Sequence, residues 1–247
     1  KIGTRKSKLA LWQANHVAKQ LQAEGYNNEL VHILSEGDKV LDTPLPLMGG
    51  KGVFTKALDD ALLNGEIDIA VHSFKDIPTE LPEGIALGAI LERENPADVI
   101  VCRNGIDFLN KETAIIATSS NRRKSQWLQR YPNHQIVDIR GNVDTRIQKL
   151  KDSNWDAAIF AAAGLIRLEI EHEIAESLDW MLHAPAQGAI AVVYRDRDEG
   201  IFNALQYLHH LETAACTLAE RDFLNELSGG CSAPVGAEAH IEEGEMH

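Results

Sequence analysis

A strand, a hydroxyl-bearing turn and a helix follow one another twice in this sequence. In the first copy a strand over residues 1–4 leads to a turn with Ser7, after which apolar residues recur at helical spacing. In the second copy a strand over 114–117 leads to the turn 118–120 and a helix over 122–129. Strands that alternate with helices predict a mainly parallel sheet covered by helices. The sequence therefore predicts an α/β fold with two lobes.

Two segments interrupt this alternation. Residues 92–96 are polar and contain Pro96, and residues 184–188 precede an apolar strand. We expect both segments to cross between the lobes. The remaining expected strands are 30–34, 67–71, 135–139 and 190–194, and the remaining expected helices are 54–63, 143–151 and 213–227.

Composition excludes several classes of protein. The longest apolar stretches, 67–71 and 157–165, are far shorter than the roughly 20 residues that span a bilayer, and we expect neither a membrane span nor a signal peptide. The net charge of -13 argues against nucleic acid or an anionic membrane as a partner. Cys102, Cys216 and Cys231 form no C-x-x-C pair, which favours a reducing, cytoplasmic setting.

One stretch of the sequence carries a local positive charge although the chain as a whole is acidic. Between Thr118 and Leu150 the only acidic residues are Asp138 and Asp144. A solvated helix face explains any single cation there equally well, and a nucleic-acid site would need a basic domain overall. Arginine makes bidentate hydrogen bonds to carboxylates, so the group as a whole indicates a small ligand with several carboxylates. The cations are Arg122, Arg123, Lys124, Arg130, Arg140, Arg146 and Lys149.

Two further residues are candidates for chemistry. Asp76 follows a buried strand, at the strand end where α/β proteins place ligands, but spacing alone favours a structural pair with Lys75 or a turn before Pro78. Cys231 follows two glycines that allow close approach of another group, although local sequence favours a small buried side chain.

Other patterns exclude two further kinds of site. The glycines around Lys51 suggest a backbone loop close to a ligand, but they lack P-loop spacing and give no support for nucleotide hydrolysis. His72, His209 and His210 are not spaced with cysteines or carboxylates as metal ligands are, and we predict no metal.

Eight ordered motifs resemble the porphobilinogen deaminase family through almost the entire chain. They occupy residues 3–13, 49–52, 72–78, 118–123, 140–146, 163–167, 187–189 and 229–231. The resemblance implies a transferase of tetrapyrrole and haem biosynthesis. Such an enzyme condenses four porphobilinogen molecules, with loss of ammonia, into the linear tetrapyrrole hydroxymethylbilane.

The resemblance also implies an architecture and a cofactor. It implies two lobes similar to those of type II periplasmic binding proteins and a small α/β third domain whose Cys231 holds dipyrromethane through a thioether. The expected domains are 1–91 with 189–207, 96–186 and 211–247. The family's third domain normally continues beyond the position of His247, so the chain is expected to be incomplete there. A monomer is expected.

Residue roles follow from the same resemblance. Asp76 is the expected catalytic carboxylate, which assists loss of ammonia and stabilises cationic intermediates. The expected cofactor-binding residues are Lys75, Thr118, Ser120, Arg122, Arg123, Arg146 and Ser73. The residues expected to contact porphobilinogen and the growing oligopyrrole chain are Arg5, Ser7, Arg140, Arg167, Gln187 and Lys51.

The sequence departs from the family at two positions and leaves other functions open. Leu47 stands where many bacterial members carry a lysine, and His183 stands where a proline is expected. A two-lobed binding protein for a small anion would use the same arginines without catalysis, but it leaves Cys231 unexplained. A homologue that has lost activity would bind the cofactor poorly.

Overall fold

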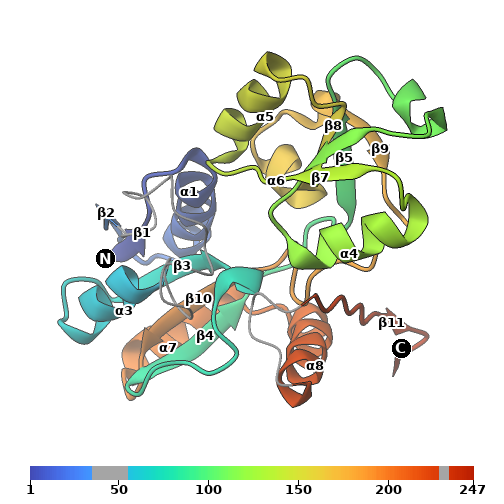
Figure 1. The fold of residues 1–247 in the computed structure, drawn as a ribbon. Helices are drawn as coiled ribbons and strands as arrows, with labels where there is room; N and C mark the ends of the chain where they lie inside the picture. The colour runs from blue at the N-terminus through green and yellow to red at the C-terminus, as the bar shows by residue number, and fades with distance from the viewer. Residues whose placement is uncertain (35–54, 228–233) are drawn as a thin grey trace.

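A computed structural model describes residues 1–34, 55–227 and 234–247 of the chain. The described residues form two lobes, each built on a five-stranded sheet with helices beside it, and a C-terminal segment that starts with a long helix (Figure 1). The predicted α/β class with two lobes is confirmed. Cys231, Lys51 and Leu47 lie outside the described residues.

Lobe 1 contains the N-terminus. Its sheet has the strand order β2-β1-β3-β10-β4, and β10 runs antiparallel to both of its neighbours. Successive residues of β3 and β10 point into two separate apolar cores, one on each face of the sheet, because side chains alternate along a strand. The strands are β1 (Ile2–Thr4), β2 (Leu30–His32), β3 (Ile69–Ser73), β4 (Ile85–Ile90) and β10 (Ile190–Arg195), and the helices are α1 (Lys8–Ala23), α3 (Lys56–Leu63) and α7 (Glu199–Leu205).

Lobe 2 repeats the arrangement. Its order is β7-β6-β8-β5-β9, with β5 antiparallel to both neighbours, as β10 is in lobe 1. Each of these antiparallel strands is the first strand after the chain enters its lobe from the other one. The strands are β5 (Asp98–Cys102), β6 (Ile115–Ala117), β7 (Gln135–Val137), β8 (Ala157–Ala161) and β9 (Ile174–Ser177), and the helices are α4 (Asn121–Arg130), α5 (Val143–Asp152) and α6 (Ala162–Arg167).

The chain crosses between the lobes twice, where the sequence predicted it. The first crossing joins β4 to β5 and the second joins β9 to β10. The Arg93 side chain in the first crossing donates to the carbonyl of Gln187 in the second, at 2.8 Å, and pairs with both carboxylate oxygens of Glu220. Glu220 also accepts from the Ala186 amide at 2.7 Å. The two crossings are therefore bound to each other and to the C-terminal helix.

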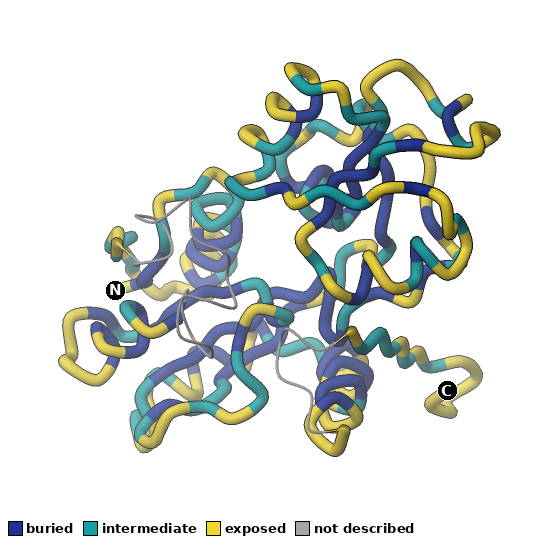
Figure 2. Tube along the Cα trace, in the orientation of Figure 1, coloured by how far each residue is buried: buried dark blue, intermediate teal, exposed yellow. Residues whose placement is uncertain are grey.

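That helix, α8 (Leu211–Glu226), lies beside lobe 1, and the short hairpin of β11 (Ile241–Glu242) and β12 (Glu245–Met246) follows it. Ala214 of α8 belongs to a lobe 1 core. Figure 2 shows burial concentrated in the central strands of both sheets and in the inner faces of the helices, with the exposed residues on the outer loops. In residues 1–34, 55–227 and 234–247, no helix is long and apolar enough to cross a membrane.

Several element limits differ from the prediction. The strand expected at 67–71 runs over Ile69–Ser73, because Ser73 and His72 pair with Ile190 and Ala191 of β10. Lys75 and Asp76 therefore follow the strand on a single 3-10 turn, Phe74–Asp76, and His72 lies inside the strand. The helix expected at 54–63 begins at Lys56.

Candidate functional site

The turn that carries Lys75 and Asp76 is fixed from two sides. The Phe74 amide donates to the Ala189 carbonyl at 3.0 Å. Arg221 of α8 donates to the carbonyls of Phe74, Ile77 and Pro78, and its guanidinium lies 4.4 Å from the centre of the Phe74 ring. Asp76 itself is exposed. The structure therefore presents a carboxylate on a rigid support at the end of β3.

Lys75 lies beside this carboxylate and reaches toward lobe 2. Its ammonium donates to Gln187 Oε1 at 3.1 Å. Burial lowers the pKa of Lys75 to about 8, and Arg123 lowers it further while Asp76 and Asp98 oppose the shift. Lys75 is thus a cation whose charge is easily lost unless an anion approaches it.

Arg146 and Arg140 supply positive charge from lobe 2. Arg146 donates to the Gly141 carbonyl at 2.7 Å. Burial lowers its pKa to about 10, with further lowering by Arg123 and Arg140 and an opposing effect of Asp76, so these groups lie within electrostatic reach of one another. The buried Nη1 of Arg140 has no hydrogen-bond partner among the described residues. A buried donor without a partner is costly, and a ligand carboxylate would satisfy it.

A buried carboxylate that the sequence did not single out joins several predicted site residues. Asp98 is fully buried and accepts from Arg122 Nη1 at 2.5 Å, from Arg123 Nη2 at 2.7 Å and from Gln187 Nε2 at 2.9 Å. Burial alone would raise the pKa of Asp98, but Arg123 and Arg122 together hold it well below its usual range. Asp98 therefore neutralises part of the cationic group and connects it through Gln187 to Lys75.

The predicted hydroxyl residues have structural contacts. Ser7 and Ser120 are the N-caps of α1 and α4, where their side chains accept from the amides of Ala10 and Arg123. Thr118 Oγ1 accepts from the Ser120 amide at 3.3 Å, and Ser73 Oγ accepts from Gln13 Nε2 at 2.9 Å. Each hydroxyl can still donate its own hydrogen to a ligand.

Arg167 lies at the junction of the lobes. It is the last residue of α6, is buried, and donates to the Gly188 carbonyl at 2.6 Å. With Gln13, Ser73 and Lys75 it lines a cavity of about 40 Å³. Arg5, in lobe 1, lies close enough to His72 to help burial lower the pKa of that histidine to about 4.

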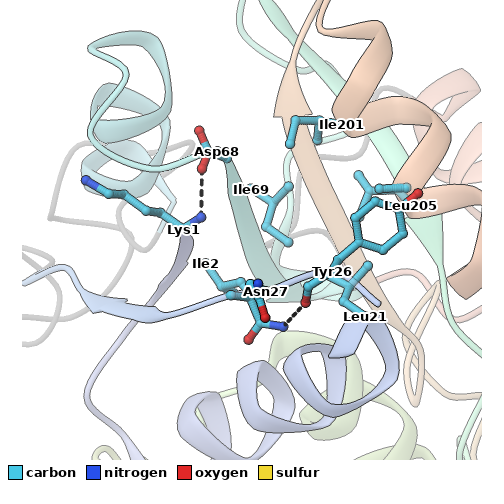
Figure 3. A pocket seen from close by; sticks show the side chains of 11 residues that line it. Lys1, Ile2, Leu21, Tyr26, Asn27, Asp68, Ile69, Ile201 and Leu205 are labelled. Atoms are coloured by element: carbon cyan, nitrogen blue, oxygen red, sulfur yellow. Dashed lines mark hydrogen bonds and ion pairs between the residues drawn. The ribbon is translucent and has the colours of Figure 1, made fainter. Parts of the chain in front are cut away.

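A larger pocket of about 130 Å³ lies within lobe 1, lined by residues of α1, β3 and α7 (Figure 3). Its floor is apolar, with Leu21, Ile69 and Ile201. Asp68 at its edge already pairs with the terminal amine of Lys1 at 2.7 Å. This pocket contains none of the predicted site residues. Asp76 and Lys75 of lobe 1 instead lie within electrostatic reach of Arg123 and Arg146 of lobe 2, and we call the region between them the cleft.

Comparison with known proteins identifies the family. The model of the porphobilinogen deaminase dipyromethane cofactor binding domain matches residues 1–203, and the model of the porphobilinogen deaminase C-terminal domain matches residues 214–247. The chain belongs to the porphobilinogen deaminase family. Members condense porphobilinogen into hydroxymethylbilane in tetrapyrrole biosynthesis and carry a dipyrromethane cofactor.

Curated relatives agree with this assignment. Porphobilinogen deaminase from Geobacter metallireducens is 48% identical over 246 residues, which cover 98% of this chain and 77% of the relative. The enzyme of the same name from Chloroherpeton thalassium is 44% identical over 251 residues, which cover 100% of this chain and 80% of that one.

Solved structures with a similar arrangement are remote in sequence. An ancestral cationic amino acid solute binding protein is 14% identical, with a TM-score of 0.49 over 92% of this chain and 90% of that one. The VFT2 domain of Bordetella pertussis BvgS is also 14% identical, with a TM-score of 0.49 over 92% of this chain and 91% of that one. Similarity at this level transfers no ligand or activity.

The cleft residues fit the family's cofactor. Each porphobilinogen unit brings an acetate and a propionate, so a two-ring cofactor is strongly anionic. The cleft offers arginine and lysine side chains that are partly or fully buried, and among them Arg140 has the unsatisfied donor described above. This donor set suits carboxylates and would not suit a neutral ligand.

Proposed function

We propose that this chain joins four porphobilinogen units head to tail at the cleft between its lobes, with Asp76 as the catalytic carboxylate. The observation that carries this proposal is the position of Asp76, an exposed carboxylate on a fixed turn within electrostatic reach of the partly buried cations Lys75 and Arg146. The bound dipyrromethane, held by Cys231, supplies the pyrrole carbon to which the first substrate ring is joined.

Asp76 has two tasks in this scheme. Loss of ammonia from porphobilinogen leaves positive charge on the pyrrole, which the Asp76 carboxylate stabilises by proximity and by accepting the pyrrole N–H. The same carboxylate accepts the proton that is released when the new ring regains aromaticity. No hydrogen bond joins the Asp76 side chain to another described residue, so its oxygens remain available to the substrate.

The surrounding residues bind carboxylates of the rings. We assign Lys75, Arg122, Arg123 and Arg146 to the cofactor. The Nη1 of Arg122 already donates to Asp98 and to the Leu182 carbonyl. The neutral partners at the cofactor are Ser73, Thr118 and Ser120. The residues assigned to substrate and the growing chain are Arg5, Ser7, Lys51, Arg140, Arg167 and Gln187.

We also propose the domain boundaries, the oligomeric state and the location of the protein. The division into domains 1–91 with 189–207, 96–186 and 211–247 is supported by the two sheets and by the crossings between them. The monomer is proposed from the family alone. A cytoplasmic location without nucleic acid or membrane partners is supported by the net charge of -13 and the few scattered cysteines. Light scattering on the purified protein tests the monomer.

The test of function uses Asp76→Asn, which keeps the size of the side chain but removes its charge. We expect tetrapyrrole formation, measured as porphyrin absorbance after oxidation, to fall at least about 100-fold, the lower end of general acid–base contributions. Asp60→Asn, on the exposed face of α3, is the control and should retain full activity. Near-normal product yield from Asp76→Asn contradicts the assigned role.

The cofactor is tested separately by intact mass. The wild-type protein should carry an adduct of two pyrrole units that Cys231→Ser lacks. An identical mass increment on both proteins would refute attachment at Cys231, and a wild-type protein without adduct or product would refute the proposed function itself.

A further inference from the structure

A tryptophan of lobe 1 lies against a cation of lobe 2. The Arg167 guanidinium is 5.6 Å from the centre of the Trp12 ring. Trp12 lies on α1 and packs against a lobe 1 core, whereas Arg167 ends α6. The pair therefore spans the cleft, and the residues Leu9 and Gln13 on the same side of α1 line the cavity that Arg167 also lines.

His16 also packs on the Trp12 ring. The two rings are stacked with centres 5.0 Å apart and planes at 11°. Burial lowers the pKa of His16, and Arg167 and Lys19 lower it further, which favours the neutral form of the ring. The indole thus contacts both the His16 ring and the Arg167 guanidinium.

Contact with an aromatic face leaves the donors of an arginine free. Arg122 and Arg123 each direct N–H groups to Asp98, which offsets one of their two positive charges. Arg167 forms no ion pair within the described residues, and its Nη2 contact is to a backbone carbonyl. A cation–π contact orients a guanidinium through its face, while the N–H groups at its edge can still bind a carboxylate.

We propose that Trp12 is the positioning residue for Arg167: it holds the guanidinium of lobe 2 against lobe 1 so that the N–H edge meets a carboxylate of the incoming substrate or growing chain. This inference rests on the proposed function of the cleft. Because its two members belong to different lobes, the contact also ties the orientation of Arg167 to the separation of the lobes.

The test compares kcat and KM of Trp12→Leu and Trp12→Phe with those of the wild-type protein. Trp12→Leu should lower kcat/KM by between about 2-fold and 30-fold, the range that corresponds to a cation–π energy of about 0.5–2 kcal/mol. Trp12→Phe, which keeps an aromatic face, should recover part of the loss. Equal losses in both variants would overturn the proposal.

A matched control removes a contact of the same kind outside the cleft. Arg130 lies 4.9 Å from the centre of the Trp180 ring on lobe 2, and neither residue is a predicted site residue or lines the cavity beside Arg167. Trp180→Leu should leave kcat/KM within about 2-fold of the wild-type value. A loss as large as that of Trp12→Leu would mean that the effect is not specific to the cleft and would overturn the proposal.

A double-mutant cycle asks whether Trp12 acts through Arg167. In an Arg167→Leu background, Trp12→Leu should cause little further loss of kcat/KM, because its target is already gone. Independent, multiplying losses would overturn the positioning role while leaving the proposed function intact. Absence of product from the wild-type protein would instead refute the proposed function, so the two failures are distinguishable.

Discussion

Replacing Asp98 by asparagine tests the electrostatic organisation of lobe 2. Asp98 is fully buried and accepts hydrogen bonds from Arg122, Arg123 and Gln187. The Asp98→Asn variant would keep the volume of the side chain but leave two buried guanidinium groups without a counter-charge. Removing one partner of a buried ion pair costs about 3–5 kcal/mol. At about 2–4 °C per kcal/mol for a chain of this size, the melting temperature should fall by roughly 6–20 °C.

Thermal unfolding followed by tryptophan fluorescence measures the melting temperature, and urea unfolding followed in the same way measures the free energy of unfolding. This signal reports mainly lobe 2, because Trp127, Trp155 and Trp180 lie there and only Trp12 lies in lobe 1. Asp60→Asn breaks an exposed pair with Lys56 on one helix and should change the free energy of unfolding by no more than about 0.5 kcal/mol.

The pH dependence gives an independent check. The folded pKa of Asp98 is lower than its unfolded value, so the stability that its charge contributes is fully present above the unfolded pKa of about 3.9. It is lost as the pH falls through the folded value. The difference between wild type and Asp98→Asn should therefore be constant from about pH 5 to 8 and shrink below about pH 3.9. A difference under about 1 kcal/mol at neutral pH would refute the reasoning.

Two further predictions concern the crossing and the cleft lysine. Gly188 has a φ of 89°, and a Cβ there would meet the Glu94 carbonyl oxygen of the other crossing, so Gly188→Ala should lower the free energy of unfolding by at least about 1 kcal/mol in the same assay. An unchanged free energy of unfolding would show that Gly188 and the Glu94 carbonyl do not lie this close together. Folding lowers the pKa of Lys75 from 10.5 to about 8. Between these two pH values the unfolded state binds more protons than the folded state, so Lys75 makes the free energy of unfolding rise with pH across this range. Lys75→Met should remove this rise, as measured by unfolding between about pH 7.5 and 10.5, and a rise that persists would contradict the shift.

Local patterns predicted the lobes because apolar periodicity is a local property. The turn at Ser7 and the turn at Ser120 were each found in the sequence, and both start a helix. Their interpretation as ligand donors was incomplete, since a hydroxyl before a helix is also the usual N-cap. The same short stretch of sequence serves either purpose, and only the structure shows that the caps are formed.

Long-range pairing explains what the sequence did not predict. The apolar run 157–165 has no clear period and divides into β8 and α6, with β8 paired to β5. Asp98 was overlooked because its partners Arg123 and Gln187 are 25 and 89 residues away. A signal did exist: Asp98 closely follows the expected crossing, where a carboxylate begins an otherwise apolar strand. A charge at the start of a buried strand needs a partner, and a lobe rich in arginine can provide it.

The cations of the cleft fall into two groups with different consequences. Arg122 and Arg123 share the Asp98 carboxylate as a buried partner, so they form ion pairs whether or not a ligand is bound. Lys75, Arg146 and Arg167 have lowered pKa values because burial removes them from water without an ion pair among the described residues. Their charge is unfavourable in the protein alone and becomes favourable when carboxylates arrive. Binding energy from an anionic cofactor therefore also serves as folding energy, since a ligand that binds only the folded state stabilises it. We therefore expect the protein to be more stable with a polycarboxylate between its lobes than without one.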